Sequence, residues 1–557
     1  MTATFTTRIT VGELAVRFLE QCGTRAAFGV ISIHNMPILD AFHRRRRIRF
    51  VSARGEAGAC NMADAYARVT GVLGVCVTST GTGAGNAAGA LVEALTAGTP
   101  MLHLTGQIEA EYLDRDLGFI HEAPAQLAML QSVSKAAFRI RDSQTALATL
   151  REAARLAFTP PCGPVSIEIP VDVQASLLDL PPDLQPAAPA PLQAAGAQVD
   201  ALAERLRAAR RPLLWLGGGA RGAGAAVQRF VQMGFGVVTS VQGRGVVAED
   251  HPATLGSFNL QKPVEDFYQT CDAMLVVGSR LRSNETLRYQ LQLPKPLLRI
   301  DANALAHNRG YASDYFVQGD ALETLNALAD RLQGRMDIAP GFGRDLKAAR
   351  EQAGYQVDAG LGAYIQLKNA LEQQVRQKKC WWVRDITLSN SMWGNRTPVL
   401  DHPRAGVHAL GGGIGQGLAM AIGTAIADAT HTLGRKTVLL AGDGGFMLNV
   451  GELACAVQEK AELVVLLMND SCYGVIRNIQ DDIYGSRHCY VDLVNPDFST
   501  LCASLKVPHF RLSDPAQTAT TLAQALQMGA GPVMVEVDMK AWGPFAAKFA
   551  GPILKKD

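Results

Sequence analysis

The sequence has almost no net charge, no closely spaced cysteine pair and no long apolar run. Its 53 Lys and Arg residues are balanced by 51 Asp and Glu residues, so bulk charge gives no indication of nucleic-acid or membrane binding. Ten cysteines are scattered from Cys22 to Cys502 without a Cys-x-x-Cys pair, which argues against a zinc site or disulfide framework. No apolar run approaches the roughly 20 residues of a membrane span, and the first ten residues contain no apolar signal segment. We therefore expect a cytoplasmic protein with reduced thiols.

Length and composition indicate several α/β domains. A chain of 557 residues is too long for one core, and three domains of about 180 residues are expected. Hydrophobic residues make up 48% of the chain, and 54 glycines with 26 prolines are typical of α/β folds with many short turns. We predict three doubly wound domains with mostly parallel sheets.

The most informative stretch covers residues 438–475. An apolar run at 438–441 indicates a buried strand, which the glycine-rich turn at 442–445 interrupts. A helix is predicted at about 448–459, followed by a second buried strand at 463–468. Strand, glycine turn, helix and strand form a βαβ unit, whose ligand site lies beyond the carboxyl ends of its strands. Asp443 and Asp470 both follow such ends.

This unit has the residues of a diphosphate site that contains a metal ion. Glycines let backbone N–H groups approach a diphosphate, and a helix N-terminus adds a favourable dipole. A carboxylate among phosphates is repelled unless a cation lies between them, so Asp443 implies a metal. Oxygen ligands from Asp443, Asp470 and the backbone carbonyl near Cys472 favour Mg²⁺. A βαβ unit with a chance acidic turn is the alternative.

Gly-Asp-Gly-Gly-Phe after a strand, with Asn-Asp about 27 positions later, resembles the diphosphate–magnesium motif of thiamine-diphosphate-dependent enzymes. That motif ends in Asn-Asn, and Asp470 alters the charge of the site more than its role. The resemblance implies Mg²⁺ ligands at Asp443, Asp470 and Cys472. The cofactor-binding residues that it implies here are Gly442, Asp443, Gly444, Gly445, Asp470, Tyr473, Gly474 and Val475.

Glu56 precedes an alanine-rich helix at 57–68, which is followed by a strand and the glycine loop 79–86. From its position alone, Glu56 caps the first turn of its helix, where a carboxylate is favoured. The surrounding sequence resembles the pyrimidine-binding domain of the same thiamine family. The resemblance implies that Glu56 contacts the N1′ atom of the aminopyrimidine ring and takes part in catalysis.

A second glycine-rich loop lies at 411–417, ahead of the Asp443 turn. Dense glycines let a backbone lie against a flat ring, although a helix-packing glycine run is the alternative. By resemblance, Ile414 is the apolar wedge that bends thiamine, and the Gly412 carbonyl accepts from the 4′-amino group. Asn390, just after the first strand of this part, is the candidate for a diphosphate contact, against a plain cap or turn residue.

The plan of small-residue helix, strand, glycine loop, helix and strand occurs twice, at 56–107 and 414–470, which indicates a repeated domain. A proline- and alanine-rich linker lies between the first domain and the middle of the chain. The expected parts are a pyrimidine-binding domain at 1–178, a linker at 179–198, a Rossmann-like middle domain at 199–340, a connecting segment at 341–375 and a diphosphate- and Mg²⁺-binding domain at 376–557.

Glycine turns at 217–222 and 278–280 of the middle domain could hold a nucleotide. Structural turns that bind nothing are at least as good an explanation, because a lone glycine-rich turn is weak evidence. Related thiamine enzymes sometimes bind FAD or a nucleotide in this domain. The sequence leaves an FAD open without supporting it.

Acid–base chemistry on a substrate needs further polar groups, and the candidates are His34, Gln107 and His121. A lone histidine is usually a satisfied surface or core residue. Several carboligases that this chain resembles have a pocket histidine at the position of His34. The first loop lacks the Val-Pro-Gly-Gly of acetolactate synthases, which argues against a biosynthetic acetolactate synthase.

The resemblance implies a carboligase or decarboxylase, similar to acetolactate synthase and benzaldehyde lyase. Such an enzyme cleaves 2-keto acids or acyloins and forms 2-hydroxyketones through an enamine. It also implies a homo-oligomer, a dimer or dimer of dimers, with active sites between subunits. The alternatives are a thiamine- and FAD-dependent oxidoreductase of pyruvate-oxidase type and a thiamine-binding scaffold without activity.

Overall fold

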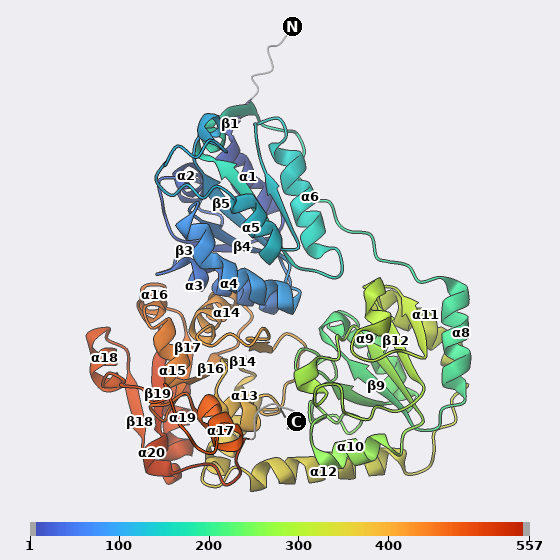
Figure 1. The fold of residues 1–557 in the computed structure, drawn as a ribbon. Helices are drawn as coiled ribbons and strands as arrows, with labels where there is room; N and C mark the ends of the chain where they lie inside the picture. The colour runs from blue at the N-terminus through green and yellow to red at the C-terminus, as the bar shows by residue number, and fades with distance from the viewer. Residues whose placement is uncertain (1–6, 550–557) are drawn as a thin grey trace.

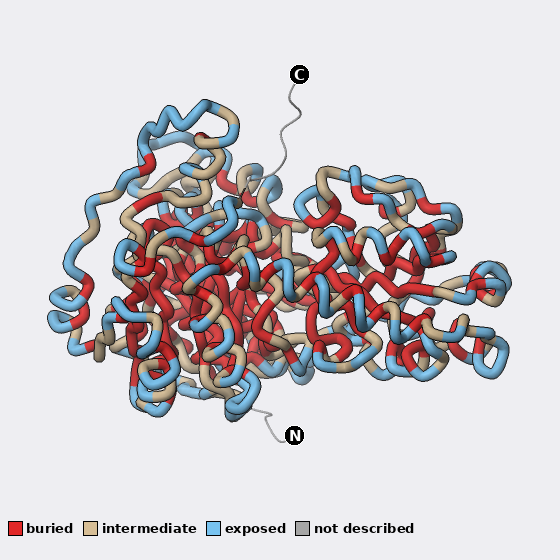
Figure 2. Tube along the Cα trace, turned by 90° about the horizontal axis from the view of Figure 1, so that it is seen from below, coloured by how far each residue is buried: buried red, intermediate tan, exposed pale blue. Residues whose placement is uncertain are grey.

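A computed structural model describes residues 7–549 of the chain (Figure 1). Three separate parallel sheets, each covered by helices, lie in the N-terminal, middle and C-terminal parts. This arrangement confirms the predicted α/β class with three mostly parallel sheets. Buried stretches run through the interior and exposed ones along the outside (Figure 2).

The N-terminal sheet has the strand order β3-β2-β4-β5-β7-β6, and all of its strand pairs are parallel. A short antiparallel pair, β1 (Arg8–Thr10) with β8 (Leu177–Asp179), lies outside it. The strands of the sheet are β2 (Ala26–Gly29), β3 (Arg49–Ser52), β4 (Gly74–Thr78), β5 (Met101–Gln107), β6 (Ala136–Arg139) and β7 (Pro164–Pro170). The helices are α1 (Val11–Gln21), α2 (Met36–Arg45), α3 (Glu56–Thr70), α4 (Thr82–Ala97), α5 (Gln126–Val133), α6 (Ala146–Phe158) and α7 (Val171–Ala175).

The middle sheet has the order β10-β9-β11-β12-β13 and is also parallel. Residues 180–195 contain no helix or strand and lead from the first sheet to the first helix of this part. The strands are β9 (Pro212–Leu216), β10 (Gly236–Thr239), β11 (Ala273–Val277), β12 (Leu297–Asp301) and β13 (Tyr315–Gln318). The helices are α8 (Gly196–Arg207), α9 (Gly224–Gln232), α10 (Lys262–Tyr268) and α11 (Ala321–Leu332). The domain boundaries expected from the sequence stay predictions.

Two long helices, α12 (Phe342–Ala359) and α13 (Tyr364–Lys378), connect the middle part to the C-terminal part; α12 runs along the lower edge of the molecule in Figure 1, and α13 packs against α19 (Thr518–Gln527) of the C-terminal part. The C-terminal sheet has the order β15-β14-β16-β17-β19-β18 and is parallel throughout. Its strands are β14 (Trp381–Arg384), β15 (Gly406–His408), β16 (Thr437–Gly442), β17 (Leu463–Asn469), β18 (His509–Leu512) and β19 (Val533–Asp538). Its helices are α14 (Gly417–His431), α15 (Asp443–Leu448), α16 (Glu452–Gln458), α17 (Gly474–Ile483), α18 (Phe498–Ser504), α19 (Thr518–Gln527) and α20 (Met539–Trp542).

The helix predicted at 448–459 is wrong in its bounds, because the chain forms two short helices there, α15 and α16. Asn449 lies in the break between these two helices. Its side-chain amide donates to the carbonyl of Gly415 at 2.7 Å. The interruption therefore ties the turn after β16 to the second glycine loop.

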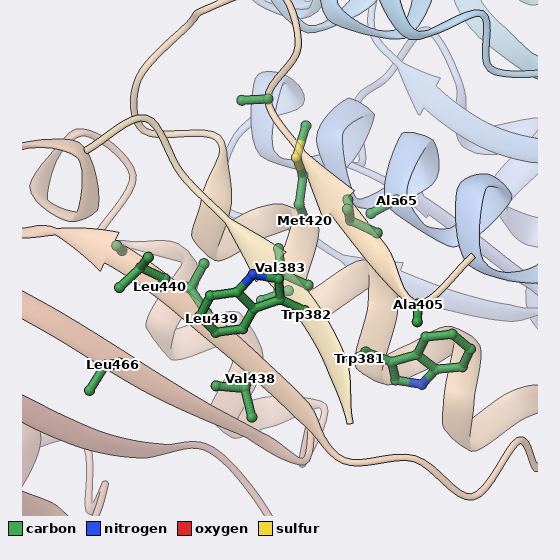
Figure 3. Packing of buried hydrophobic residues seen from close by; sticks show 14 of the residues in the cluster. Ala65, Trp381, Trp382, Val383, Ala405, Met420, Val438, Leu439, Leu440 and Leu466 are labelled. Atoms are coloured by element: carbon green, nitrogen blue, oxygen red, sulfur yellow. The ribbon is translucent and has the colours of Figure 1, made fainter. Parts of the chain in front are cut away.

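Helices α3 and α14 pack closely and join the N-terminal and C-terminal parts. A Cβ on Gly423 of α14 would lie 2.2 Å from the carbonyl oxygen of Met62 in α3, so only glycine allows this approach. Figure 3 shows part of the adjoining core, with Trp381 and Trp382 of β14, Leu439 of β16 and Met420 of α14. This contact holds the N-terminal and C-terminal parts, which contain the two glycine loops, against each other within one chain.

None of the helices in the described part of the chain combines the length and hydropathy that a membrane crossing requires. The cytoplasmic location stays a prediction.

Candidate active site

Glu56 is the first residue of α3 and lies half-buried at the mouth of the first glycine loop. The side-chain amide of Asn86 donates to its Oε2 at 3.1 Å. A Cβ on Gly83 would lie 3.1 Å from its Oε1, so glycine leaves the carboxylate free to face outward. Loop and helix together present one carboxylate at the carboxyl ends of the strands, where α/β proteins bind ligands.

His34 and His121 come together at the same end of the N-terminal sheet, with ring centroids 5.3 Å apart. His121 Nδ1 lies 3.2 Å from the hydroxyl of Ser79, which in turn hydrogen-bonds Ser32 at 2.7 Å. The His34 side chain is buried, and its Nδ1 has no hydrogen-bond partner among the described residues. Burial first, and then the charge of His121, lower the pKa of His34, so this ring is neutral at pH 7.

Gln107 ends β5 but lies inside the domain. Its Oε1 accepts from the Thr80 hydroxyl at 2.8 Å and from the backbone N–H of Ile108 at 2.9 Å. Its side-chain amide lies 3.5 Å from Glu168. The structure therefore places Gln107 in a buried network beneath the glycine loop, and its catalytic role stays a prediction.

Asp443 and Asp470 follow β16 and β17, adjacent strands of the C-terminal sheet. Asp443 begins α15, and its Oδ2 accepts from Asn495 Nδ2 at 2.5 Å. Asp470 Oδ1 accepts from the backbone N–H of Cys472 at 3.1 Å. A Cβ on Gly474 would lie 2.7 Å from Asp470 Oδ2, so glycine is needed beside this carboxylate.

The two carboxylates have the chemistry of a cation site. Burial raises the pKa of Asp443, and burial with the neighbouring Asp443 raises the pKa of Asp470 to about 7. Neither forms an ion pair with Lys, Arg or His within residues 7–549. A divalent cation would offset both charges, and oxygen ligands suit Mg²⁺. The described chain contains no cluster of three or more His, Cys, Asp and Glu side chains that could hold a metal ion.

The second glycine loop, residues 411–417, presents its middle to solvent. Gly412 has a φ of +83° with open space beside it, and Ile414 is 39% exposed. The C-terminal end of the loop is fixed by Asp385, whose carboxylate accepts from the backbone N–H of Gly415 and Gly417 at 3.1 Å. The backbone at Gly412 and the apolar side chain of Ile414 are therefore exposed on a loop whose C-terminal end is fixed by Asp385.

Asn390 begins a π-helical turn (Asn390–Gly394) after β14, a geometry often found at functional sites. Its side chain is buried, and its Oδ1 has no partner among the described residues. Tyr473 lies against the glycine turn, since a Cβ on Gly444 would lie 2.6 Å from its ring. The predicted ligand-binding residues of the C-terminal part therefore gather at one end of its sheet, with Gly442, Gly445 and Val475 on the same two turns.

The structure forms two groups of predicted residues, one around Glu56 and the histidines and one around Asp443 and Asp470. In the described part of the single chain, no hydrogen bond or ion pair joins the two groups directly. Sequence reasoning missed Asp385 and Asn495. Asp385 follows a buried strand as Asp443 does, so the same rule could have found it. Asn495 lies in an irregular segment that contains no such signal.

Both glycine turns of the middle part line a cavity of about 360 Å³ between the three parts of the chain. Its wall includes several arginines, and the guanidinium of Arg299 is buried with two unpartnered nitrogens among the described residues. Burial, followed by the charges of Arg68 and Arg404, lowers the pKa of Arg221 to about 9. The cavity has a basic lining, and nothing in it indicates a flavin.

Three family models match the chain in order. They are described as the N-terminal TPP binding domain, central domain and C-terminal TPP binding domain of thiamine pyrophosphate enzymes, and they cover residues 9–131, 199–328 and 389–537. Thiamine pyrophosphate is another name for thiamine diphosphate.

Curated relatives agree with these matches. A protein of Pseudomonas aeruginosa named probable 2-ketoarginine decarboxylase AruI is 32% identical, over 88% of each chain. Acetolactate synthase isozyme 2 large subunit of Escherichia coli is 26% identical, over 95% of each. Acetolactate synthase 1, chloroplastic, of Zea mays is 26% identical, over 94% of this chain and 84% of its own length.

Fold, site and relatives together define an enzyme that uses thiamine diphosphate. The chain belongs to the thiamine pyrophosphate enzymes. Within that family it is of the type that its acetolactate synthase and decarboxylase relatives represent.

Proposed function

We propose that this chain is a Mg²⁺- and thiamine-diphosphate-dependent decarboxylase and carboligase. It cleaves 2-keto acids or acyloins and joins the retained fragment to a carbonyl acceptor, which gives a 2-hydroxyketone. The observation that carries the proposal is the carboxylate pair of buried Asp443 and half-buried Asp470 beside a glycine turn, with which no cationic side chain of residues 7–549 forms an ion pair. Relatives named as a 2-ketoarginine decarboxylase and as acetolactate synthases support both halves of the activity.

In this proposal Asp443, Asp470 and the backbone carbonyl near Cys472 hold Mg²⁺. Backbone N–H groups of the turn at 442–445 and the start of α15 face the diphosphate, where the helix dipole favours negative charge. Asn390 and the residues Tyr473 to Val475 line the same end of the sheet. These groups bind and orient the cofactor and take no part in proton transfer.

The exposed middle of the second glycine loop and Glu56 hold the two rings. When bound, thiamine diphosphate supplies a carbon nucleophile and a sink for the electrons released with CO₂. Ile414, which is exposed, would offer an apolar contact to the rings, and the Gly412 carbonyl would accept a hydrogen bond from the ring amine. Glu56 holds and returns a proton at the ring nitrogen N1′.

His34 and His121 act on the substrate. The unpartnered Nδ1 of His34 lies beside His121 at the same sheet end as Glu56. A buried polar atom without a partner is costly, and a substrate carboxylate or carbonyl oxygen would supply the missing hydrogen bond. We assign His34 to substrate binding and proton transfer, with His121 as its neighbour in the pocket.

Assembly completes the site in this proposal. Beyond β2, Ile31 and Ile33 are 62% and 53% exposed, and in the C-terminal part Leu448 and Ile476 are 53% and 49% exposed. Both apolar groups border the residues assigned to the cofactor. A second copy that places its N-terminal part over this C-terminal part would cover them and bring Glu56 to the diphosphate site. We therefore propose a homodimer or a dimer of dimers, which light scattering tests directly.

A substrate panel tests the reaction. Holoprotein with Mg²⁺ is incubated with 2-keto acids that carry short, branched, aromatic or guanidino side chains, with and without aldehyde acceptors. The proposal predicts CO₂ release with at least one acid and a 2-hydroxyketone when an acceptor is added. CO₂ release without any 2-hydroxyketone would restrict the activity to decarboxylation. Cofactor binding without turnover of any acid or acyloin would refute the proposal.

A further inference from the structure

The second glycine loop is held at its N-terminal end by a glutamate of the N-terminal part. Glu93, on α4, is buried and accepts from the backbone N–H of Leu410 at 2.7 Å and of Gly411 at 2.5 Å. A Cβ on Gly411 would lie 2.7 Å from Glu93 Oε2, so the carboxylate contacts the bare backbone. Arg68 donates to Glu93 Oε1 at 2.9 Å and keeps this buried carboxylate paired.

The start of α3, in the N-terminal part, is held by a glutamate of the C-terminal part. Glu452, on α16 of the C-terminal part, is buried and accepts from the backbone N–H of Arg54 at 3.1 Å and of Gly55 at 3.0 Å. A Cβ on Gly58 would lie 2.1 Å from Glu452 Oε1. These are the two N–H groups immediately before Glu56, at a helix N-terminus that has no side-chain cap of its own.

The two contacts are reciprocal. The N-terminal part contributes Glu93 to the C-terminal part, and the C-terminal part contributes Glu452 to the N-terminal part. Each glutamate binds two consecutive backbone N–H groups that come just before a residue assigned to the cofactor rings. A carboxylate that accepts two N–H bonds fixes both peptide planes, because charge-assisted hydrogen bonds are shorter and about twice as strong as neutral ones. Both glutamates are buried, and their carboxylates bind backbone N–H groups and, for Glu93, the guanidinium of Arg68.

We propose that Glu93 and Glu452 are positioning residues, which set the glycine loop at 410–414 and the Glu56 carboxylate in their cofactor-binding geometry before the cofactor arrives. Arg282 of the middle part assists Glu93, because it donates to the Leu410 carbonyl at 2.9 Å and to the Thr96 carbonyl at 2.7 Å. The inference rests on the proposed function and adds to it two residues that act through the backbone.

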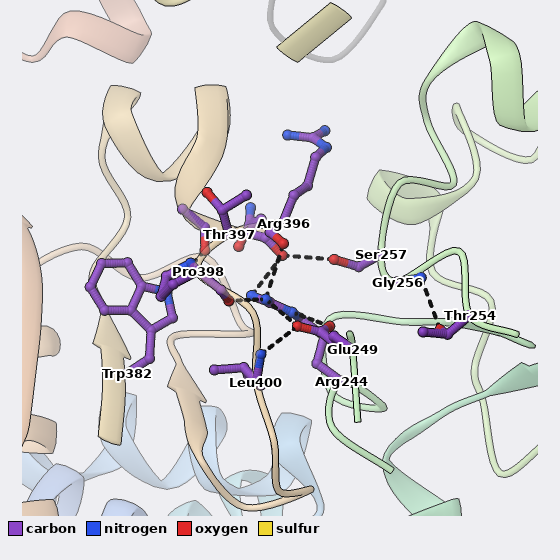
Figure 4. Close-up of polar contacts among 12 residues, drawn as sticks. Arg244, Glu249, Thr254, Gly256, Ser257, Trp382, Arg396, Thr397, Pro398 and Leu400 are labelled. Carbon is purple, nitrogen blue, oxygen red and sulfur yellow. Dashed lines mark hydrogen bonds and ion pairs between the residues drawn. The ribbon is translucent and has the colours of Figure 1, made fainter. Parts of the chain in front are cut away.

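The alternative is that these buried glutamates only stabilise the packing of the two parts, and the chain offers a matched control. Glu249 of the middle part is also buried, pairs with Arg244 at 2.7 Å and accepts from the backbone N–H of Leu400 at 2.8 Å (Figure 4). It thus joins two parts of the chain by an arginine pair and a backbone N–H bond, as Glu93 does, but its partner Leu400 precedes β15, whereas the glycine loop follows that strand. Glu249→Gln measures the cost of such a change to folding alone.

Hydrogen–deuterium exchange of the full-length apoprotein, followed by mass spectrometry, tests the placement of each segment. Glu93→Gln is expected to raise amide exchange at 409–412 about tenfold or more and to leave 53–56 unchanged, because one charge-assisted bond is lost. Glu452→Gln is expected to do the reverse. Glu249→Gln should alter neither segment. Gly411→Ala displaces the Glu93 carboxylate and Gly58→Ala displaces the Glu452 carboxylate, because the added Cβ would occupy its place. These variants replace a glutamate variant that does not fold.

Calorimetric titration with thiamine diphosphate and Mg²⁺ gives the second measurement. Glu93→Gln should weaken cofactor binding about tenfold, whereas Glu249→Gln changes the Kd less than twofold even if both lower the apoprotein Tm equally. Glu452→Gln should lower kcat about tenfold with a smaller change in Kd, because Glu56 follows its contact. Wild-type protein that binds no cofactor would overturn the proposed function. Wild-type binding with glutamate variants that match Glu249→Gln in exchange, Kd and kcat would overturn only the positioning role.

Discussion

Replacing Asp443 with Asn should change the apoprotein and the holoprotein in opposite directions. The substitution keeps the size of the side chain, and its amide oxygen can still accept from Asn495 Nδ2, which lies 2.5 Å from Asp443 Oδ2. The substitution removes the charge of the buried member of a carboxylate pair that has no cationic side-chain partner in the described residues. In apoprotein this relieves repulsion, and in holoprotein it removes a ligand of the cation.

The expected magnitudes follow from the electrostatics of a like-charge pair. Two full charges about 4 Å apart repel by about 4 kcal/mol at an effective dielectric constant of 20, and partial solvation together with the raised pKa of Asp470, about 7, reduces the gain to about 1–2 kcal/mol. A domain of this size gains about 2–4 °C in Tm per kcal/mol, so the apoprotein should melt a few degrees higher. Loss of a charged metal ligand should weaken Mg²⁺-dependent cofactor binding at least 100-fold, which corresponds to about 2.7 kcal/mol.

Thermal melts with and without Mg²⁺ and thiamine diphosphate separate the two effects. The wild-type protein should gain Tm on cofactor addition, whereas Asp443→Asn should start higher and gain almost nothing. Asn495→Ala is a useful companion, because it removes the neighbour and leaves the charge pair. An Asp443→Asn apoprotein that melts lower than wild type and still gains the full cofactor shift would refute the reasoning.

Three further predictions concern the rest of the site. Glu56→Gln should reduce kcat at least 100-fold while circular dichroism and Tm stay unchanged, because the amide cannot exchange a proton with N1′; wild-type turnover would contradict its role. Burial and His121 lower the pKa of His34 below 6.5, so kcat/KM should stay flat from pH 8 to 6.5 and fall at lower pH as the ring takes up a proton. In His34→Asn that acid limb should disappear, and an unchanged profile would exclude His34. Purified protein should be colourless and active, and flavin absorbance at one equivalent per chain would instead favour the oxidoreductase of pyruvate-oxidase type.

Much of the fold could be predicted because parallel strands buried on both faces are continuous apolar runs. The runs at 438–441 and 463–468 became β16 and β17 with shifts of a residue at their ends. The single helix predicted at 448–459 was wrong, because the apolar spacing continues across Asn449 although the chain breaks there into two helices. The Asn449 side chain donates to the carbonyl of Gly415 in this break. Local periodicity contains no information about that distant partner.

The candidate site divides in the same way. Asp443 and Asp470 could be found because a strand end followed by an acidic residue is a local pattern. Glu93 and Glu452 could not, since each is an ordinary polar residue within a helix and acquires its partner only when the N-terminal and C-terminal parts pack together. Asn495 reaches Asp443 from an irregular segment 52 positions away. Roles that depend on the packing of two domains need the three-dimensional structure.

The central claim is that a divalent cation joins Asp443 and Asp470 to the diphosphate of thiamine diphosphate. Titration calorimetry of metal-free wild-type protein with thiamine diphosphate, first in EDTA and then with Mg²⁺, tests it most directly. We predict tight binding at one site per chain only when Mg²⁺ is present. Equal affinity in EDTA, or no binding under either condition, would contradict the account.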